Sequence, residues 1–213
     1  RGLGDVYKRQ YHTCALDDAG VVCWGYNQHG QVVAPELIDP IQVSAGGGHS
    51  CALDQSGVVC WGYNEYEQTT VPALNTPVQI TTGFDHSCAL HRFGVSCWGA
   101  NQYGQTTVPR LRQPSRLSAG FEHTCAIDNT GVVCWGYNGS GQTSVPSLAN
   151  PSQISAGFSH TCAIHDSGAR CWGDDQFQQS TVPALNNPTH VSAGFDHTCA
   201  IDASGVVCWG NND

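Results

Sequence analysis

Residues 123–136 read HTCAIDNTGVVCWG, and the pattern of this stretch returns every 37 residues along the chain. Each copy has one cysteine near its start and a second cysteine nine positions later, directly before a tryptophan. All 12 cysteines of the chain belong to this pattern: Cys14 and Cys23, Cys51 and Cys60, Cys88 and Cys97, Cys125 and Cys134, Cys162 and Cys171, Cys199 and Cys208. A fixed period of this length is typical of solenoids, propellers and repeat arrays. The recurring residues are therefore architectural, and function must be sought in what differs between copies.

The copy at residues 117–153 predicts four short strands. The first is the apolar run at 117–120, and the next two, at 123–127 and 132–136, are joined by a turn that Asp and Asn open and Gly closes. The last of these is β-branched and aromatic, as strands often are. A fourth strand is expected at 142–145, where a proline stops it.

The hairpin register predicts how the cysteines pair. A four-residue turn sets Cys125 directly opposite Cys134. Opposed residues of antiparallel strands lie about 4.5–5.5 Å apart, which a disulfide accepts. The spacing therefore favours one disulfide in each copy, with free buried thiols and a metal site as the alternatives.

Both faces of the predicted hairpin are apolar. One face carries Cys125, Ile127, Val132 and Cys134, and the other carries Ala126, Val133 and Trp135. Such a sheet must be covered on both sides, and small sheets stacked around an axis make a β-propeller. We therefore predict an all-β fold, a propeller of about 37-residue blades with about five and a half blades present, and not a linear β-solenoid. The predicted repeats are 6–42, 43–79, 80–116, 117–153, 154–190 and 191–213.

The two ends of the chain depart from the repeat. Residues 1–10 break the pattern, and we interpret them as a non-repeat, foreign segment, so that residues 11–213 form a single domain. The sequence stops partway through the sixth copy, which favours a fragment of a longer repeat protein. If the ring is open, the end blades expose an apolar face, and we expect self-association.

The repeat resembles a known family. The run at residues 12–31, His-Thr-Cys-Ala-Leu followed by Gly-Val-Val-Cys-Trp-Gly, Asn and Gly-Gln, is similar to the regulator of chromosome condensation (RCC1) repeat and recurs over residues 11–213. Its paired cysteines suggest a bacterial form, similar to β-lactamase-inhibitor propellers. The resemblance implies a seven-bladed parent ring, of which fewer blades are present here. It does not imply nucleotide exchange on a GTPase, since one fold hosts many functions.

Composition narrows the partners and the compartment. The net charge is -9, and no lysine follows Lys8, so a nucleic-acid partner is disfavoured. No apolar run is long enough to predict a membrane span. Six predicted disulfides indicate an oxidising compartment, which would be extracellular, periplasmic or at the cell surface.

We predict no catalytic residue, no metal and no cofactor. His123, Cys125 and Cys134 could meet, but eight residues between two cysteines is not a usual zinc spacing. The recurrent histidine is expected to be structural and to bond the backbone at its turn. The channel is expected to be lined by the Val-Ser-Ala-Gly strands, which are small and non-ionisable, so an enzyme with a central-channel site is a weak alternative.

One end of the propeller is predicted to gather aromatic and acidic residues. Strand direction places the turn after the first strand and the loop after the third strand at the same end. The candidate partner-binding residues there are Tyr26, Tyr63, Tyr66, Tyr103, Tyr137, Phe177, Phe84, Asp85, Phe121, Glu122, Phe195 and Asp196. The recurrent phenylalanines either wedge between blades or are exposed, and the loop-tip aromatics are expected to be exposed. Arg92, Arg110, Arg112 and Arg116 are expected at the opposite end.

These observations favour a non-catalytic binding scaffold of an exported protein. Its ligand would be a protein or a glycan, recognised by the aromatic and acidic rim, because interfaces favour aromatic residues on rigid scaffolds. A structural cell-surface array, whose repeats mainly supply stability, is the alternative.

Overall fold

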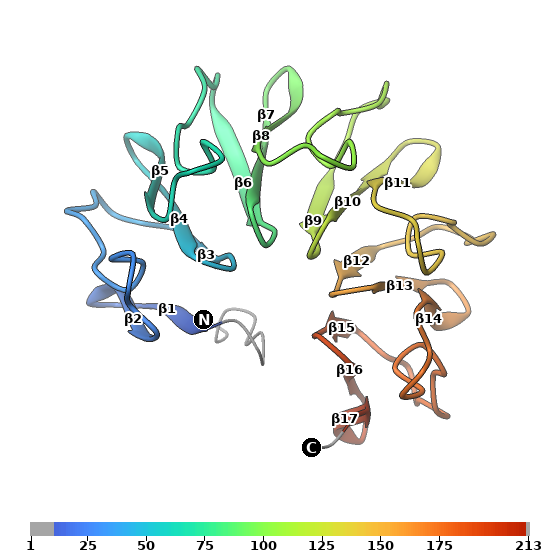
Figure 1. Cartoon of the computed structure of the whole chain (residues 1–213). Coiled ribbons are helices and arrows are strands. Elements are labelled where there is room, and N and C mark those ends of the chain that lie inside the picture. Colours follow the sequence, from blue (N-terminus) through green and yellow to red (C-terminus); the bar gives the residue numbers. More distant parts are fainter. Residues whose placement is uncertain (1–10, 212–213) are drawn as a thin grey trace.

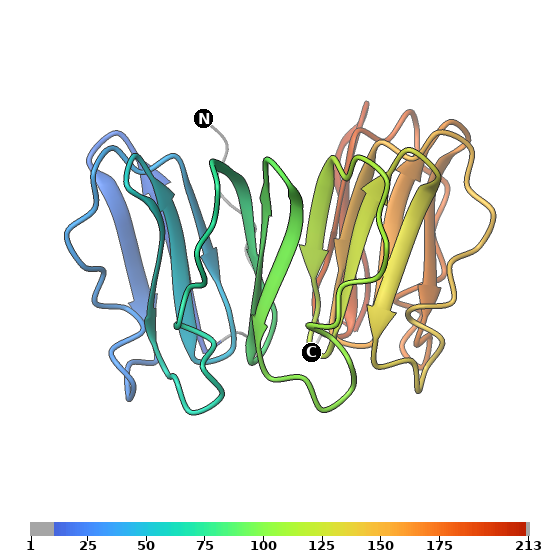
Figure 2. The same cartoon turned by 90° about the horizontal axis from the view of Figure 1, so that it is seen from above.

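The structure is a computed structural model that describes residues 11–211. Six small antiparallel sheets stand side by side in an open arc around a central axis (Figure 1). Their strands run roughly along that axis (Figure 2). The predicted all-β propeller is confirmed, whereas the interpretation of residues 1–10 lies outside the described residues. No helix that could span a membrane occurs in residues 11–211.

Each blade consists of consecutive strands, the first blade having two within the described residues. The first and second blades contain β1 (His12–Asp17) and β2 (Gly20–Gly25), then β3 (Gln42–Ala45), β4 (His49–Asp54) and β5 (Gly57–Gly62). The third and fourth contain β6 (Pro77–Thr82), β7 (His86–His91) and β8 (Gly94–Gly99), then β9 (Arg116–Ala119), β10 (His123–Asp128) and β11 (Gly131–Gly136). The fifth and sixth contain β12 (Gln153–Ala156), β13 (His160–His165) and β14 (Gly168–Gly173), then β15 (His190–Ala193), β16 (His197–Asp202) and β17 (Gly205–Gly210).

The predicted fourth strand is wrong. Residues 142–145 form turns and a return segment instead. The backbone N–H of Ser144 donates to the Gly141 carbonyl at 2.9 Å, and that of Thr143 donates to the Asn138 side chain at 2.9 Å. These local partners take the groups that a fourth strand would offer to β11, so each complete blade has three strands.

The predicted hairpin register is present in every blade. Cys125 lies opposite Cys134, and the structure contains the six predicted disulfides, with Cα atoms 4.0–4.1 Å apart. This Cα separation is shorter than the expected 4.5–5.5 Å. It is nearer to the value of a pair without backbone hydrogen bonds, in which opposed residues lie closest. Each bond therefore joins the second and third strands of one blade.

The core lies between blades. Cys125 and Ile127 of the fourth blade pack against Ile154, Ala163 and Trp172 of the fifth. The disulfide face of one blade thus covers the tryptophan face of the next, which accounts for two apolar faces on each sheet. Burying large apolar side chains in this way stabilises by roughly 1.5–3 kcal/mol each.

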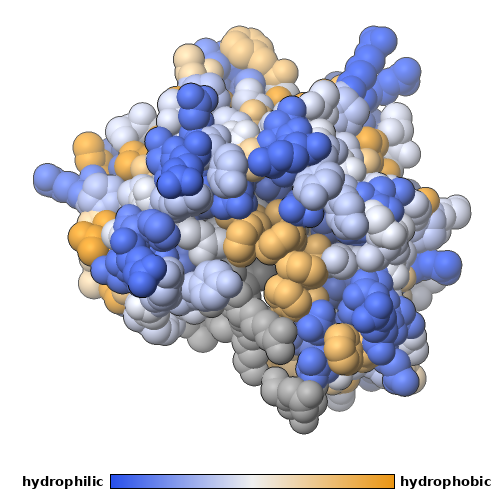
Figure 3. Space-filling view, viewed as in Figure 1, coloured by the Kyte–Doolittle hydropathy of each residue, from blue (hydrophilic) through white to orange (hydrophobic). Residues whose placement is uncertain are grey.

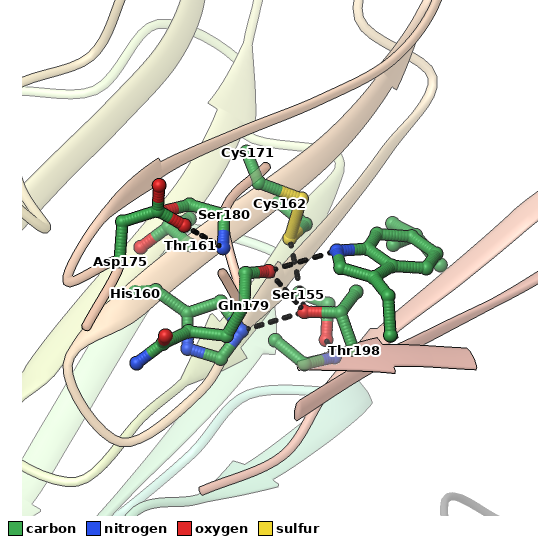
Figure 4. Close-up of a disulfide and its surroundings, with 12 residues drawn as sticks. Ser155, His160, Thr161, Cys162, Cys171, Asp175, Gln179, Ser180 and Thr198 are labelled. Carbon is green, nitrogen blue, oxygen red and sulfur yellow. Dashed lines mark hydrogen bonds between the residues drawn. A yellow bond between two sulfur atoms is a disulfide. The ribbon is translucent and has the colours of Figure 1, made fainter. Parts of the chain in front are cut away.

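A hydrogen-bonded junction also joins each blade to the next (Figure 4). His160 Nε2 lies 2.8 Å from the Thr198 hydroxyl, and that hydroxyl donates to the Gln179 carbonyl at 2.9 Å. Because the hydroxyl proton is committed to the carbonyl, the ring N–H must donate to the hydroxyl oxygen. Trp209 Nε1 donates to the same carbonyl at 3.0 Å. Equivalent pairs are His12–Ser50, His49–Ser87, His86–Thr124 and His123–Thr161.

The junction corrects the expected role of the recurrent histidine. It is structural, but it bonds a side chain of the next blade and not the backbone of its own turn. Burial lowers the pKa of His86 and His160 to about 4 and that of His49 and His123 to about 3, with neighbouring histidines adding to the effect in three of these cases. Each ring is therefore neutral near neutral pH.

Replacing Thr124 by Val is expected to lower the free energy of unfolding by about 1–3 kcal/mol, because His86 Nε2 would keep a buried proton without an acceptor and Gln105 would lose a donor. Thr13→Val is the matched control, since no such bond of its hydroxyl is present within residues 11–211. Urea unfolding of both variants measures the difference, and equal losses would contradict the role of the junction.

The buried histidines predict acid sensitivity. The folded pKa of His86 is about 4, below its ordinary value of 6.5, so the unfolded chain binds more protons between these two values. Stability should be complete above pH 6.5 and fall as pH drops toward 4, by about 1.4 kcal/mol per histidine and pH unit. Urea unfolding across this window should show the loss. His123→Gln should reduce the slope and His29→Gln, at an exposed position, should not; a flat profile would contradict the prediction.

The end blades expose the faces that neighbours cover elsewhere. Trp24 of the first blade is 52% exposed, whereas Trp135 of the fourth is 8% exposed. On the sixth blade Ile201 and Val206 of the disulfide face are exposed. Since a disulfide face packs on a tryptophan face within the arc, the two end faces are complementary, which permits head-to-tail contacts between copies.

The 213-residue chain is therefore expected to self-associate as its concentration rises. Trp24→Glu or Val206→Glu should shift the species toward monomer in sedimentation velocity, because a charge would then be buried at the contact. Val78→Glu, at an exposed position of β6, is the control and should not change the association. A monodisperse wild-type monomer would overturn this prediction.

Candidate functional site

The turn after the first strand and the loop after the third strand lie at the same end of each blade. In the fourth blade the backbone N–H of Tyr137, after β11, donates to the carbonyl of Glu122, between β9 and β10, at 2.8 Å. The same contact recurs from Tyr63 to Gly48 and from Asp174 to Ser159. The longer loops accordingly project from one side of the arc, at the bottom of Figure 2. The predicted placement therefore stands, with a return segment replacing the fourth strand.

An inner arc of phenylalanines surrounds the mouth of the central channel at this end. The rings of Phe84, Phe121, Phe158 and Phe195 lie in sequence, with centroids 4.2, 4.1 and 3.8 Å apart. All four are half-buried, since each packs on its neighbours and also lines a cavity of about 300 Å³. Figure 3 shows apolar side chains gathered at the centre of the face, with hydrophilic surface around them. The phenylalanines are thus partly wedged between blades and partly open to the channel mouth.

The backbone holds this inner arc in place. The N–H of Phe121 donates to the carbonyl of Gly157 at 3.1 Å, and the N–H of Phe158 donates to that of Gly194 at 3.0 Å. In the second blade Gly47 stands where the later blades have phenylalanine. A Cβ atom there would lie 2.6 Å from the ring of Phe84, so glycine gives that ring its space.

An outer arc of aromatic residues lies on the loops that follow the third strands. His29 contacts Tyr63 with ring centroids 4.7 Å apart, and Tyr103 contacts Tyr137 at 4.9 Å. Tyr63 also lies 6.2 Å from Tyr66. The loop aromatics therefore form two separate groups, one around Tyr63 and one made of Tyr103 and Tyr137. The exposed aromatic residues on these loops are Tyr26, Tyr66, Tyr103, Tyr137 and Phe177.

Two positions explain why the outer arc is interrupted. Ala100 and Asp174 occupy the place that tyrosine fills in the loops of the first, second and fourth blades. Asp174 instead accepts a hydrogen bond from the side chain of Gln179 at 3.0 Å. Phe177 is therefore exposed on its loop tip without a tyrosine at the base of that loop.

Carboxylates lie between the two arcs. Burial raises the pKa of Asp85, whose carboxylate accepts a hydrogen bond of 3.4 Å from Gln68. Burial also raises the pKa of Glu122, and the negative charge of Asp85 adds to that effect. Asp196 occupies the equivalent position of the sixth blade. In the outer arc Glu65 accepts a hydrogen bond from Tyr63, which raises the pKa of that phenol to about 12.

The opposite mouth of the channel is polar. Here each glutamine at the start of an inner strand bonds the edge of the next blade: Gln79 donates to the Leu117 carbonyl at 2.9 Å and accepts from its N–H at 3.0 Å. Arg116 and His190 stand at the same repeat position as Gln79 and line a cavity of about 490 Å³. The expectation of a small, non-ionisable channel lining is therefore wrong at this end, because the repeat position before the Val-Ser-Ala run also faces the channel.

The structure adds residues that sequence reasoning did not select. Tyr11 and Gly47 line the phenylalanine cavity, although neither residue type recurs at its position in the other copies of the repeat. Phe158, one of the recurrent phenylalanines that the sequence placed at this end, lies at the centre of the inner arc. Within residues 11–211 no group of three metal-ligating side chains lies together.

Comparison with a protein-family model gives a match along the whole arc. The model describes a "Regulator of chromosome condensation (RCC1) repeat" and matches residues 10–31, 41–68, 78–105, 115–142, 152–179 and 189–213. No protein with a curated description matches the sequence.

Solved structures share the fold over nearly the full chain. The entire ectodomain of the Physcomitrella patens receptor kinase CR4 is 29% identical with a TM-score of 0.78, over 94% of this chain and 59% of that one. The CRINKLY WD40 ectodomain of the Arabidopsis thaliana receptor kinase ACR4 is 30% identical with a TM-score of 0.77, over 93% of this chain and 80% of that one. Yeast RCC1 (Prp20), solved bound to Kap60, is 20% identical with a TM-score of 0.80, over 94% of this chain and 68% of that one. This last likeness concerns the fold alone. The chain thus spans 59% of the length of the CR4 ectodomain.

Proposed function

Because this chain belongs to the regulator of chromosome condensation (RCC1) repeat family, whose propellers serve as binding or interaction scaffolds, we propose that it is a non-catalytic scaffold that binds a partner protein. The partner contacts the end of the propeller that carries the inner and outer aromatic arcs. The observation that carries this proposal is the exposure of Tyr66, Tyr103 and Phe177 on loops of a rigid frame. Aromatic residues dominate the binding energy of protein interfaces, and loops on rigid scaffolds commonly supply specificity.

The frame supports such a role. Each loop is anchored at its base by a disulfide-closed hairpin and by the junction to the next blade, so little ordering is needed on binding. The loops differ between blades at their tips, where His29, Tyr66, Tyr103, Ser140 and Phe177 occupy one repeat position. Variation on the loops of a repeating frame is what a recognition surface requires.

Export is part of the proposal. Six disulfides within the repeats indicate an oxidising, extracellular-type environment. Two of the similar structures are ectodomains of receptor kinases, which supports the same compartment for this chain. A non-catalytic role is supported by five of the recurrent histidines, which are buried in junctions and not available to a substrate: His12, His49, His86, His123 and His160.

The test is the triple variant Tyr66→Ser, Tyr103→Ser, Phe177→Ser in a capture experiment with immobilised protein and extracellular proteins of the source. Loss of these aromatics should weaken capture of the partner by at least about tenfold, since interface aromatics are common hot spots. Phe93→Ser is the control, because Phe93 is even more exposed (76%) but lies on the hairpin turn between β7 and β8, at the other end.

The variants must be equally folded, which their melting temperatures show. Unchanged capture by the folded triple variant would contradict the proposal and favour a structural array. Selective binding to a glycan array, lost in the same variant, would keep the surface but replace the protein by a glycan.

A further inference from the structure

The phenylalanine cavity is mainly apolar. Besides Phe84, Phe121, Phe158 and Phe195 it is lined by Tyr11 and by glycine, alanine and threonine residues, and no charged side chain of residues 11–211 lines it. Its volume of about 300 Å³ is at the lower end of ligand sites. Its glycines cannot gain a side chain without a clash: a Cβ at Gly120 would lie 2.3 Å from the Gly157 carbonyl. The cavity is therefore fixed in shape and suits one apolar side chain better than a charged group, whose burial there would be costly.

Acidic residues directly follow two of the phenylalanines that line this cavity. Asp85 directly follows Phe84, and Glu122 directly follows Phe121, so that each carboxylate lies between the inner and the outer arc. The two carboxylates interact with one another electrostatically, and both are partly withdrawn from water. Glu65 adds a further carboxylate in the outer arc.

No positive charge of the described chain balances them. Arg92 lies in a hairpin turn at the opposite end, and Arg116 lies at the polar mouth of the channel. Arg110 and Arg112 are on a return segment, and Arg170 is on β14. Neither Asp85 nor Glu122 forms an ion pair within residues 11–211. The cavity thus lies beside two carboxylates for which residues 11–211 supply no counter-charge, on a chain of net charge -9.

We propose that this end binds a basic segment of a partner protein, which inserts one apolar side chain into the phenylalanine cavity and sets its flanking arginines or lysines against Asp85 and Glu122. The inference rests on the proposed binding function and names the chemistry of the partner. The apolar stems of arginine and lysine can lie over the phenylalanine rings while their charged ends reach the carboxylates, and a cation near an aromatic face is itself favourable. Charge complementarity also excludes acidic segments, for which like charges would be brought together.

The probes are three short synthetic peptides with fluorescent labels: Gly-Arg-Leu-Arg-Gly, Gly-Arg-Ser-Arg-Gly and Gly-Glu-Leu-Glu-Gly. Fluorescence anisotropy with the full chain should show the tightest binding for the first peptide. Replacing leucine by serine, or both arginines by glutamates, should each weaken binding by about tenfold. Added salt should weaken the first peptide as well, because exposed charges are screened.

Two variants assign the preferences to the two parts of the site. Asp85→Asn with Glu122→Gln should abolish the preference for arginine over glutamate and keep the preference for leucine over serine. Phe121→Ala should do the reverse, and Phe158→Leu, which keeps an apolar group, is the second choice if the first variant unfolds. Asp39→Asn with Asp166→Asn removes the same charge at the hairpin-turn end and should change nothing.

The outcomes separate this inference from the proposed function. Equal binding of the acidic and basic peptides, preferences that persist in both variants, or no binding of any peptide would overturn the basic-segment inference. If the Tyr66, Tyr103 and Phe177 triple variant still loses partner capture in that case, the binding function stands and only the partner chemistry is wrong. If the peptide preferences appear as expected while the triple variant captures normally, the inner arc binds and the role given to the outer loops is wrong.

Discussion

The junction between neighbouring blades is the interaction on which the rest of the structure depends. A buried histidine of one blade donates a hydrogen bond to a hydroxyl of the next blade. That hydroxyl and an indole N–H, both of the next blade, donate to the same backbone carbonyl of the blade that carries the histidine. These groups are buried or partly buried, so each must find a partner or cost free energy. Their mutual satisfaction fixes the angle and spacing between blades. The apolar contact of disulfide face and tryptophan face then fills the remaining space.

This repeated junction explains why the two mouths of the channel can differ so much. Backbone edges of the inner strands are closed by glutamine side chains at one mouth and by turn-to-turn hydrogen bonds at the other. The first mouth is consequently polar, while at the second mouth the phenylalanines are free to stack on one another. The same repeat thus gives the channel one polar mouth and one aromatic mouth.

The aromatic end combines constancy with variation. Its inner arc comes from a recurring position and is nearly continuous, whereas its outer arc comes from loops whose residues change from blade to blade. The changes are tolerated because loop tips contribute little to the junctions. Carboxylates between the arcs give this end its charge, and the arginines of the described chain lie elsewhere.

The sequence by itself determined the period, the hairpin register and the pairing of Cys125 with Cys134, because these depend on contacts within about nine residues and on turn chemistry. It also placed the aromatic candidates at one end, since strand direction alternates. Only the tertiary structure decided that residues 142–145 are not a strand, that His160 bonds Thr198, and that Phe121, Phe158 and Phe195 stack around a cavity. The reason is physical: these partners belong to different blades, and their meeting depends on how the blades pack, which no local pattern records.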